Sequence, residues 1–155
     1  MIHYLSELLG DDLTALLIAV PLLSATLCIL LRRARWTWVL AVVVSWGVFL
    51  DAAYLLSRVM SSGTISYAEG GWVPPWGIEL RVDLLNALVL LIVTGICAIV
   101  VTAAPRSLAQ EVPERRHYLF YAAYLLCMTG LAGMTITGDA FNVFVFLEIS
   151  SLSSY

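Results

Sequence analysis

The chain has 155 residues, of which 61% are hydrophobic and only 12% are charged, and its mean hydropathy is +0.94. Soluble domains are about half apolar and about a quarter charged. This composition excludes a water-soluble globular domain and indicates a protein that crosses a membrane several times. The net charge is −3, and the first residues, MIHYLSELLGDD, lack the basic segment of a signal peptide. We therefore expect no cleaved signal peptide.

Four apolar runs are long enough to cross a bilayer as helices, which requires about 20 residues each. We predict helices at about 13–31, 36–56, 84–104 and 118–137. A fifth run, 140–155, would rise about 24 Å as a helix, against about 30 Å of hydrocarbon. The predicted fold is an all-α polytopic membrane protein, with four complete transmembrane helices and most of a fifth. Since a fifth helix cut short would leave carbonyl groups unpaired in lipid, we expect residues 1–155 to be the N-terminal part of one larger transmembrane domain.

The segment 57–83 is the only sizeable part that we predict to lie outside the membrane. Two short alternating runs, 64–67 and 78–82, flank a centre that is rich in glycine and proline. This pattern predicts an external loop that resembles a β-hairpin. We expect it to cap the helices and to have a structural role.

Arginine determines the predicted orientation, because all eight basic residues are Arg. Positively charged residues collect on the cytoplasmic side of membrane proteins. Only Arg58 and Arg81 lie on the side of the external loop, which places the N-terminus outside the cell. Topology explains these basic clusters, so we do not predict nucleic-acid binding. The six arginines of the two cytoplasmic loops are Arg32, Arg33, Arg35, Arg106, Arg115 and Arg116.

Two acidic residues lie inside predicted helices. Asp51 is five residues from the outer end of the second helix, where it can reach the interface or the hairpin, and we favour a structural role for it. Glu148 lies eight residues after Ala140, about 12 Å along the fifth helix. That depth is too great for its short side chain to reach water.

An acid at such a depth costs about 2.5–3.5 kcal/mol on insertion scales, and such residues usually face a bundle interior or a hydrated cavity on a proton or ion pathway. Ser151 and Tyr155 follow Glu148 at spacings of three and seven, so the three side chains form one polar stripe. Ser150 and Ser154 lie on the opposite side and predict protein neighbours there too. We favour proton transfer as the role of Glu148; the alternative is a hydrogen-bonded acid that only ties helices together.

A basic partner would let Glu148 take up and release a proton, but the chain contains no Lys and no Arg within a predicted span. The partner must therefore come from another part of the molecule. In the fourth helix, Gly130 and Gly133 are expected to let a neighbouring helix approach closely.

No other kind of site is predicted. Cys28, Cys97 and Cys127 lie in apolar runs without CxxC spacing, and we interpret them as packing residues. His3 and His117 are interpreted as polar residues at the membrane interface. The sequence has no P-loop, Rossmann glycine pattern, HExxH or GxSxG motif, so we expect neither a cofactor nor a metal site.

Two stretches resemble the antiporter-like subunits of complex I and its relatives. One is GGWVPPWGIELRVDLLNALVLL, and the other is YAAYLLCMTGLAGMTITGDAFNVFVFLEISSLSSY. Within the second, the pattern TGD-x-FN-x-F-V-F-x-E extends from Thr137 to Glu148. The resemblance covers essentially the whole chain and points most strongly to the D-type subunits of multisubunit Mrp-type Na⁺/H⁺ antiporters.

This resemblance implies a fourteen-helix subunit with its N-terminus outside, in which two inverted five-helix repeats carry half-channels joined by a central polar axis. It implies that Glu148 pairs with a Lys of the seventh helix, beyond residue 155. It also implies a location in the inner (plasma) membrane of the cell. The implied partners are the lipid bilayer, other antiporter or respiratory-complex membrane subunits, protons and Na⁺.

The predicted function is that of a part of a proton-translocating subunit of a multisubunit Na⁺/H⁺ antiporter, a secondary transporter and not an enzyme. Two alternatives remain open. The first is a proton-pumping subunit of a respiratory NADH:quinone oxidoreductase or a membrane-bound hydrogenase, driven by redox chemistry elsewhere in the complex. The second is a membrane scaffold subunit that transports nothing.

Overall fold

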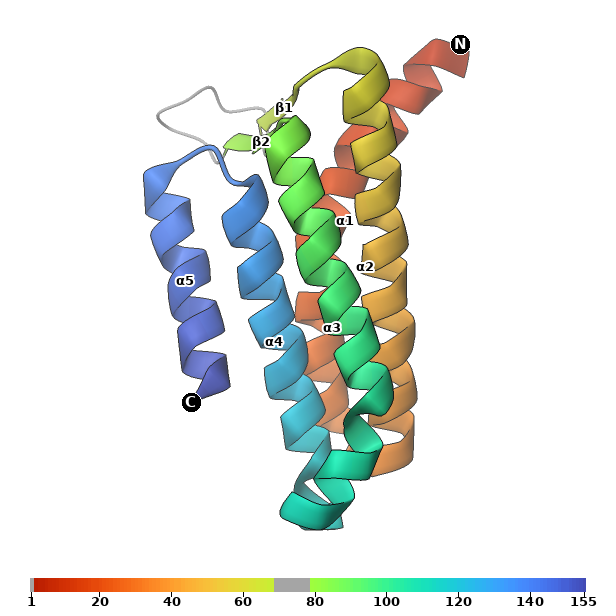
Figure 1. Cartoon of the computed structure of the whole chain (residues 1–155), viewed down its shortest axis with the longest axis vertical. Coiled ribbons are helices and arrows are strands. Elements are labelled where there is room, and N and C mark those ends of the chain that lie inside the picture. Colours follow the sequence, from red (N-terminus) through yellow and green to blue (C-terminus); the bar gives the residue numbers. More distant parts are fainter. Residues whose placement is uncertain (1, 69–78) are drawn as a thin grey trace.

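In the described part of the chain, four long helices and a shorter fifth lie side by side along the long axis of the molecule, with a small hairpin at one end (Figure 1). The computed structural model describes residues 2–68 and 79–155. Within this part of the chain, four helices are long and apolar enough to cross a membrane, and a fifth apolar helix is shorter. The predicted fold class is confirmed. The elements are α1 (Ile2–Leu31), α2 (Ala34–Ser62), β1 (Ile65–Ala68), β2 (Glu79–Val82), α3 (Leu84–Glu111), η2 (Glu114–Arg116), α4 (His117–Ile136) and α5 (Ala140–Ser154).

The first three helices are longer than the sequence predicted. α1 begins at Ile2 instead of residue 13, α2 ends at Ser62 instead of 56, and α3 ends at Glu111 instead of 104. The 28 residues of α3 rise about 42 Å, which exceeds the hydrocarbon core of a bilayer. The prediction followed the apolar runs, which match only the hydrocarbon, whereas a helix can continue into the polar interface with its backbone groups still paired.

Pro105 directly follows the predicted end of α3, but the helix continues through it. Proline has no backbone N–H, so the carbonyl four residues earlier loses its donor within the helix. That carbonyl belongs to Val101, and the indole Nε1 of Trp38 in α2 donates to it at 3.1 Å. A donor from a neighbouring helix thus replaces the missing backbone hydrogen bond.

α4 is the central helix of the fold. It packs against α1, α3 and α5 and also contacts α2. Its buried side chains include Leu125, Met128 and Ile136, which form part of the apolar core together with residues of the three preceding helices. The other helices expose many large apolar side chains, as expected of helices whose solvent is lipid.

The hairpin is formed as the sequence predicted. β1 and β2 pair antiparallel, with Ile65 opposite Val82, and residues 69–78 between them lie outside the described part of the chain. Leu80 forms a bridge with Thr137 in the turn between α4 and α5, and it is buried. The hairpin therefore connects the beginning of α5 to the end of the bundle from which α3 starts.

Candidate functional site

The start of α5 is held in place by its N-cap. Asp139 accepts a hydrogen bond from the backbone N–H of Phe141 at 3.2 Å, and its other carboxylate oxygen accepts one from Asn142 Nδ2 at 3.1 Å. Asn142 is buried. An acid at a helix N-terminus pairs with backbone N–H groups that have no partner within the helix. The TGD-x-FN motif thus contains the residues that begin the helix on which Glu148 lies.

Two glycines of α4 allow α5 to pack very closely. A Cβ atom on Gly130 would lie 2.6 Å from the carbonyl oxygen of Phe146 and 2.7 Å from the Cβ of Ser150, and one on Gly133 would meet the ring of Phe146. Only glycine leaves enough room at these positions. Next to them, Ser150 Oγ lies 3.5 Å from the thiol of Cys127. The predicted close approach at Gly130 and Gly133 is confirmed, and so is the prediction that the Ser150 side of α5 has protein neighbours.

Glu148 lies on the opposite side of α5. Residues of a helix follow one another at about 100°, so Glu148 is about 180° from the midline between Phe146 and Ser150, which contact α4. Its side chain is exposed, and Ser151 and Tyr155 of the predicted polar stripe are exposed too. The bundle interior that was expected around Glu148 is not provided by α1–α4.

Glu148 has neither a hydrogen bond nor an ion pair with any of the described residues. Large apolar side chains surround it on the same exposed face, among them Phe141, Phe144 and Leu152. An ionised carboxylate in apolar surroundings costs free energy, which protonation or pairing with a cation avoids. The arrangement therefore suits an acid whose partner lies outside the part of the chain that the structure describes.

Asp51 is deeper in its helix than the sequence suggested. Because α2 continues to Ser62, the carboxylate lies eleven residues from the helix end, about 16 Å along it. It lines a hollow of about 240 Å³ with Leu16 and Val20 of α1, and its Oδ1 is enclosed without a hydrogen-bond partner. It forms no hydrogen bond with the described part of the hairpin, and its structural role stays a prediction.

The remaining candidates lie away from α5 or on its α4 side. The three cysteines are free, with Cys28 buried and Cys97 and Cys127 half-buried, and their interpretation as packing residues stays a prediction. His117 Nε2 lies 2.8 Å from the carbonyl oxygen of Val112, in the turn before α4. The side chain of His3 lies outside the described part. No group of three or more His, Cys, Asp or Glu residues that could hold a metal ion occurs among the described residues.

No protein-family model matches the chain. It is 39% identical over 156 residues to the N-type subunit of NADH-quinone oxidoreductase from Desulforudis audaxviator, covering 92% of this chain and 29% of that protein. It is 31% identical over 109 residues to the D-type subunit of the Na⁺/H⁺ antiporter from Alkalihalophilus pseudofirmus, covering 70% of this chain and 22% of that protein. The chain thus spans less than a third of the length of these relatives.

The fold is similar to that of a chain in the solved structure of the Mrp complex from Dietzia sp. DQ12-45-1b. The TM-score is 0.81 at 28% sequence identity, and the match covers 95% of this chain and 27% of the other. The two relatives identified by sequence are subunits of an oxidoreductase and of an antiporter. These are the two kinds of complex to which the motif around Glu148 pointed. The chain is accordingly a member of the superfamily of antiporter-like subunits of complex I and Mrp complexes, over the part of their length that it spans.

Proposed function

We propose that the chain forms part of a proton-translocating subunit of a multisubunit Na⁺/H⁺ antiporter, and that Glu148 is the acid that carries the proton. The observation that best supports this role is the position of Glu148. It lies within an apolar helix, on the side that faces away from α4, without a partner among the described residues. An acid with no structural bond to maintain is free to change its protonation state.

The proposed mechanism has two states of Glu148. In the first, no cation is near, and the side chain is a neutral carboxylic acid with the proton on one carboxyl oxygen. In the second, a basic side chain from another part of the subunit approaches, and the carboxylate that remains after proton release pairs with it. The released proton moves to water or to the next proton acceptor along the path, so charge and proton number balance.

The exposed face of α5 supports the supply of this base from elsewhere in the subunit. Phe141, Phe144 and Leu152 are exposed around Glu148 and would be covered by further helices. The chain spans 29% of the length of its oxidoreductase relative, so a larger subunit has ample sequence for them. We expect one of these helices to bring a Lys to Glu148.

The similarity to a subunit of NADH-quinone oxidoreductase supports a second candidate, in which the same acid serves a proton pump driven by redox chemistry. The two candidates differ in what starts proton movement. An antiporter responds to Na⁺ alone, whereas a redox-driven pump requires electron transfer in the complex. In either case, we propose that the subunit lies in the plasma membrane. We also propose that its N-terminus is outside, because six of the eight arginines lie in or near the turns between α1 and α2 and between α3 and α4.

The test uses the full-length subunit with its partner subunits in inverted membrane vesicles that carry a pH-sensitive dye. We expect Glu148→Gln to abolish the dye response to added Na⁺, and Glu148→Asp to retain part of it. Glu111→Gln, the same change at an exposed acid at the end of α3, is the matched control and should leave the response within about twofold of wild type. Each variant is compared at equal amounts of subunit in the membrane.

Full activity of Glu148→Gln would remove Glu148 from the mechanism and favour the scaffold interpretation. A dye response that appears only when an electron donor is added, and that Glu148→Gln abolishes, would replace the antiporter by the redox-driven pump. Adding K⁺ in place of Na⁺ in the same vesicles determines the transported cation.

A further inference from the structure

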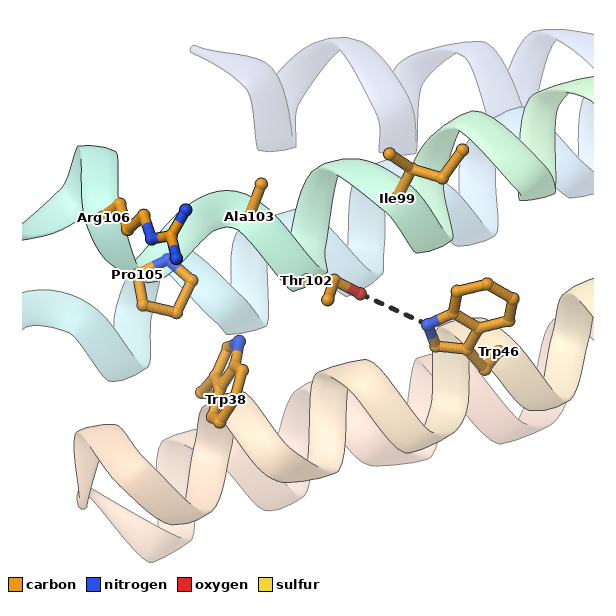
Figure 2. Close-up of a pocket in the computed structure, with 7 residues that line it drawn as sticks. All are labelled: Trp38, Trp46, Ile99, Thr102, Ala103, Pro105 and Arg106. Carbon is orange, nitrogen blue, oxygen red and sulfur yellow. Dashed lines mark hydrogen bonds between the residues drawn. The ribbon is translucent and has the colours of Figure 1, made fainter.

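A groove of about 610 Å³ lies between α2 and α3, near the end of the bundle that carries the arginine-rich turns (Figure 2). Trp38 and Trp46 contribute from α2, and Ile99, Thr102 and Arg106 are among the residues that contribute from α3. Neither the proton-transfer site nor any motif of the sequence involves this groove. It lies on the outside of the bundle, since Trp46, Ile99 and Arg106 are exposed.

Both indole N–H groups of the groove are already used within the protein. Trp38 Nε1 donates to the Val101 carbonyl that Pro105 leaves without a backbone donor, at 3.1 Å. Trp46 Nε1 donates to Thr102 Oγ1 at 3.2 Å, as Figure 2 shows. The surface that the two rings offer to an occupant is therefore apolar.

The groove is charged only at one end. Among the described residues that line it, Arg106 is the single charged side chain, and in Figure 2 it lies at the opposite end of the groove from Trp46, with Trp38 between them. From Arg106 to Ile99 the helix rises about 10 Å towards the middle of the membrane. This distribution suits an occupant that is anionic at the membrane surface and apolar further in.

A neighbouring hollow adds to the positive charge at this end. It has a volume of about 270 Å³, shares Trp38 and Pro105 with the groove, and is lined by Arg35 and Glu114 as well. Arg35 and Arg106 carry two positive charges and Glu114 carries one negative charge, so the net charge is positive where the groove opens to the interface. A guanidinium group offers up to five N–H donors in a planar arrangement that suits phosphate oxygens.

We propose that this groove binds an anionic phospholipid, with its phosphate at Arg106 and an acyl chain along the rings of Trp38 and Trp46. Basic pockets between transmembrane helices bind anionic lipid headgroups in this way, and tryptophan is favoured at the membrane interface. A transmembrane helix of a partner subunit is the competing occupant. A net positive charge at the surface and two aromatic rings further in match the headgroup and the acyl chain of such a lipid, which favours the lipid.

The first test measures the phospholipids that remain bound when the full-length subunit is purified in mild detergent with its partners. We expect Arg106→Gln to bind phosphatidylglycerol about tenfold more weakly, as expected for the loss of a hydrogen-bonded charge. Arg116→Gln removes the same charge from an exposed site on η2 at the same end, and should retain the wild-type amount of lipid. Equal loss in both variants, or in neither, would overturn the proposal.

The second test uses tryptophan fluorescence of the same assembly in vesicles. In a variant in which Trp36, Trp72, Trp76 and every tryptophan elsewhere in the assembly are changed to Phe, brominated phosphatidylglycerol should quench Trp38 and Trp46 more strongly than brominated phosphatidylcholine. Arg106→Gln should remove this preference, and Arg116→Gln should preserve it. Equal quenching by the two lipids would indicate ordinary lipid contact, and no quenching by either would indicate a partner subunit in the groove; both results would overturn the proposal. If the Trp variant does not insert, the lipid content of the two arginine variants decides alone.

Discussion

The ring of Phe146 in α5 packs directly against the backbone of Gly133 in α4, where any side chain on that glycine would overlap it. One turn earlier in α4, Gly130 lies against the backbone of α5. α5 packs chiefly on α4 among the described elements, so these two contacts determine which side of α5 faces the bundle and which side presents Glu148.

Alanine at Gly130 should loosen the contact between α4 and α5. Its methyl group would lie 2.6 Å from the Phe146 carbonyl oxygen, and backbone atoms cannot move aside as a flexible side chain can. We expect a loss of about 1–3 kcal/mol, typical of overpacking. The measurement is the formation of a disulfide between Cys127 and a cysteine placed at Ser150, whose side chains now lie 3.5 Å apart.

Gly47→Ala is the control for this experiment, because a Cβ on Gly47 would have no atom within 4 Å. It should leave the yield of the disulfide unchanged. A wild-type yield in Gly130→Ala would mean that α4 and α5 are not held together by this contact.

Removing the indole of Trp38 should destabilise α3 much more when residue 105 is proline than when it is alanine. Trp38→Phe leaves the Val101 carbonyl without its donor, which we expect to cost about 1–3 kcal/mol. In a Pro105→Ala background the backbone N–H of residue 105 can bond that carbonyl, so the same substitution should cost much less. The four proteins of this double-mutant cycle are the wild type, the two single variants and the double variant. The thermal midpoint of helix loss, measured for each by circular dichroism, shows how far the cost of Trp38→Phe depends on Pro105.

Trp36→Phe serves as the reference in this cycle, since Trp36 is exposed and has no hydrogen bond with the described residues. It should have little effect in either background. Equal costs of Trp38→Phe with and without Pro105 would contradict the role given to the indole.

The two acids Asp51 and Asp139 should respond in opposite directions to the same substitution. Asp51→Leu removes an enclosed carboxylate oxygen that has no partner among the described residues, so we expect the thermal midpoint of the purified subunit to rise. Asp139→Leu removes the N-cap of α5 and the partner of the buried Asn142 amide, so we expect a loss of about 0.5–2 kcal/mol. A fall in the midpoint of Asp51→Leu as large as that of Asp139→Leu would indicate that Asp51 has a stabilising partner in the assembled subunit.

The proposed orientation can be tested by labelling single cysteines in a variant whose native cysteines, Cys28, Cys97 and Cys127 among them, are replaced by Ala. Thr64→Cys, at the hairpin end, should react with a membrane-impermeant maleimide in intact cells. Gln110→Cys, near the other end of α3, should react only in inverted vesicles. Both positions are exposed, so accessibility depends on the side of the membrane. The reverse pattern would place the N-terminus in the cytoplasm.

The sequence alone determined the parts of this fold that depend on the solvent. A hydrophobic content of 61% requires lipid, and lipid requires helices whose backbone groups are paired internally, so the spans could be predicted directly. The hairpin and the glycines of α4 were also predictable, because alternation and the absence of a side chain have local consequences. The presence of an acid within the fifth helix needed no structure either.

Only the tertiary structure decided how the helices are rotated and where they end. α5 has both apolar and polar side chains on opposite sides, so its composition does not indicate which face meets α4, and the packing of Phe146 on Gly133 turns Glu148 outward. The continuation of α3 past Pro105 depends on Trp38, which is distant in the sequence. Hydropathy is a property of each segment, whereas rotation and helix ends depend on contacts between segments.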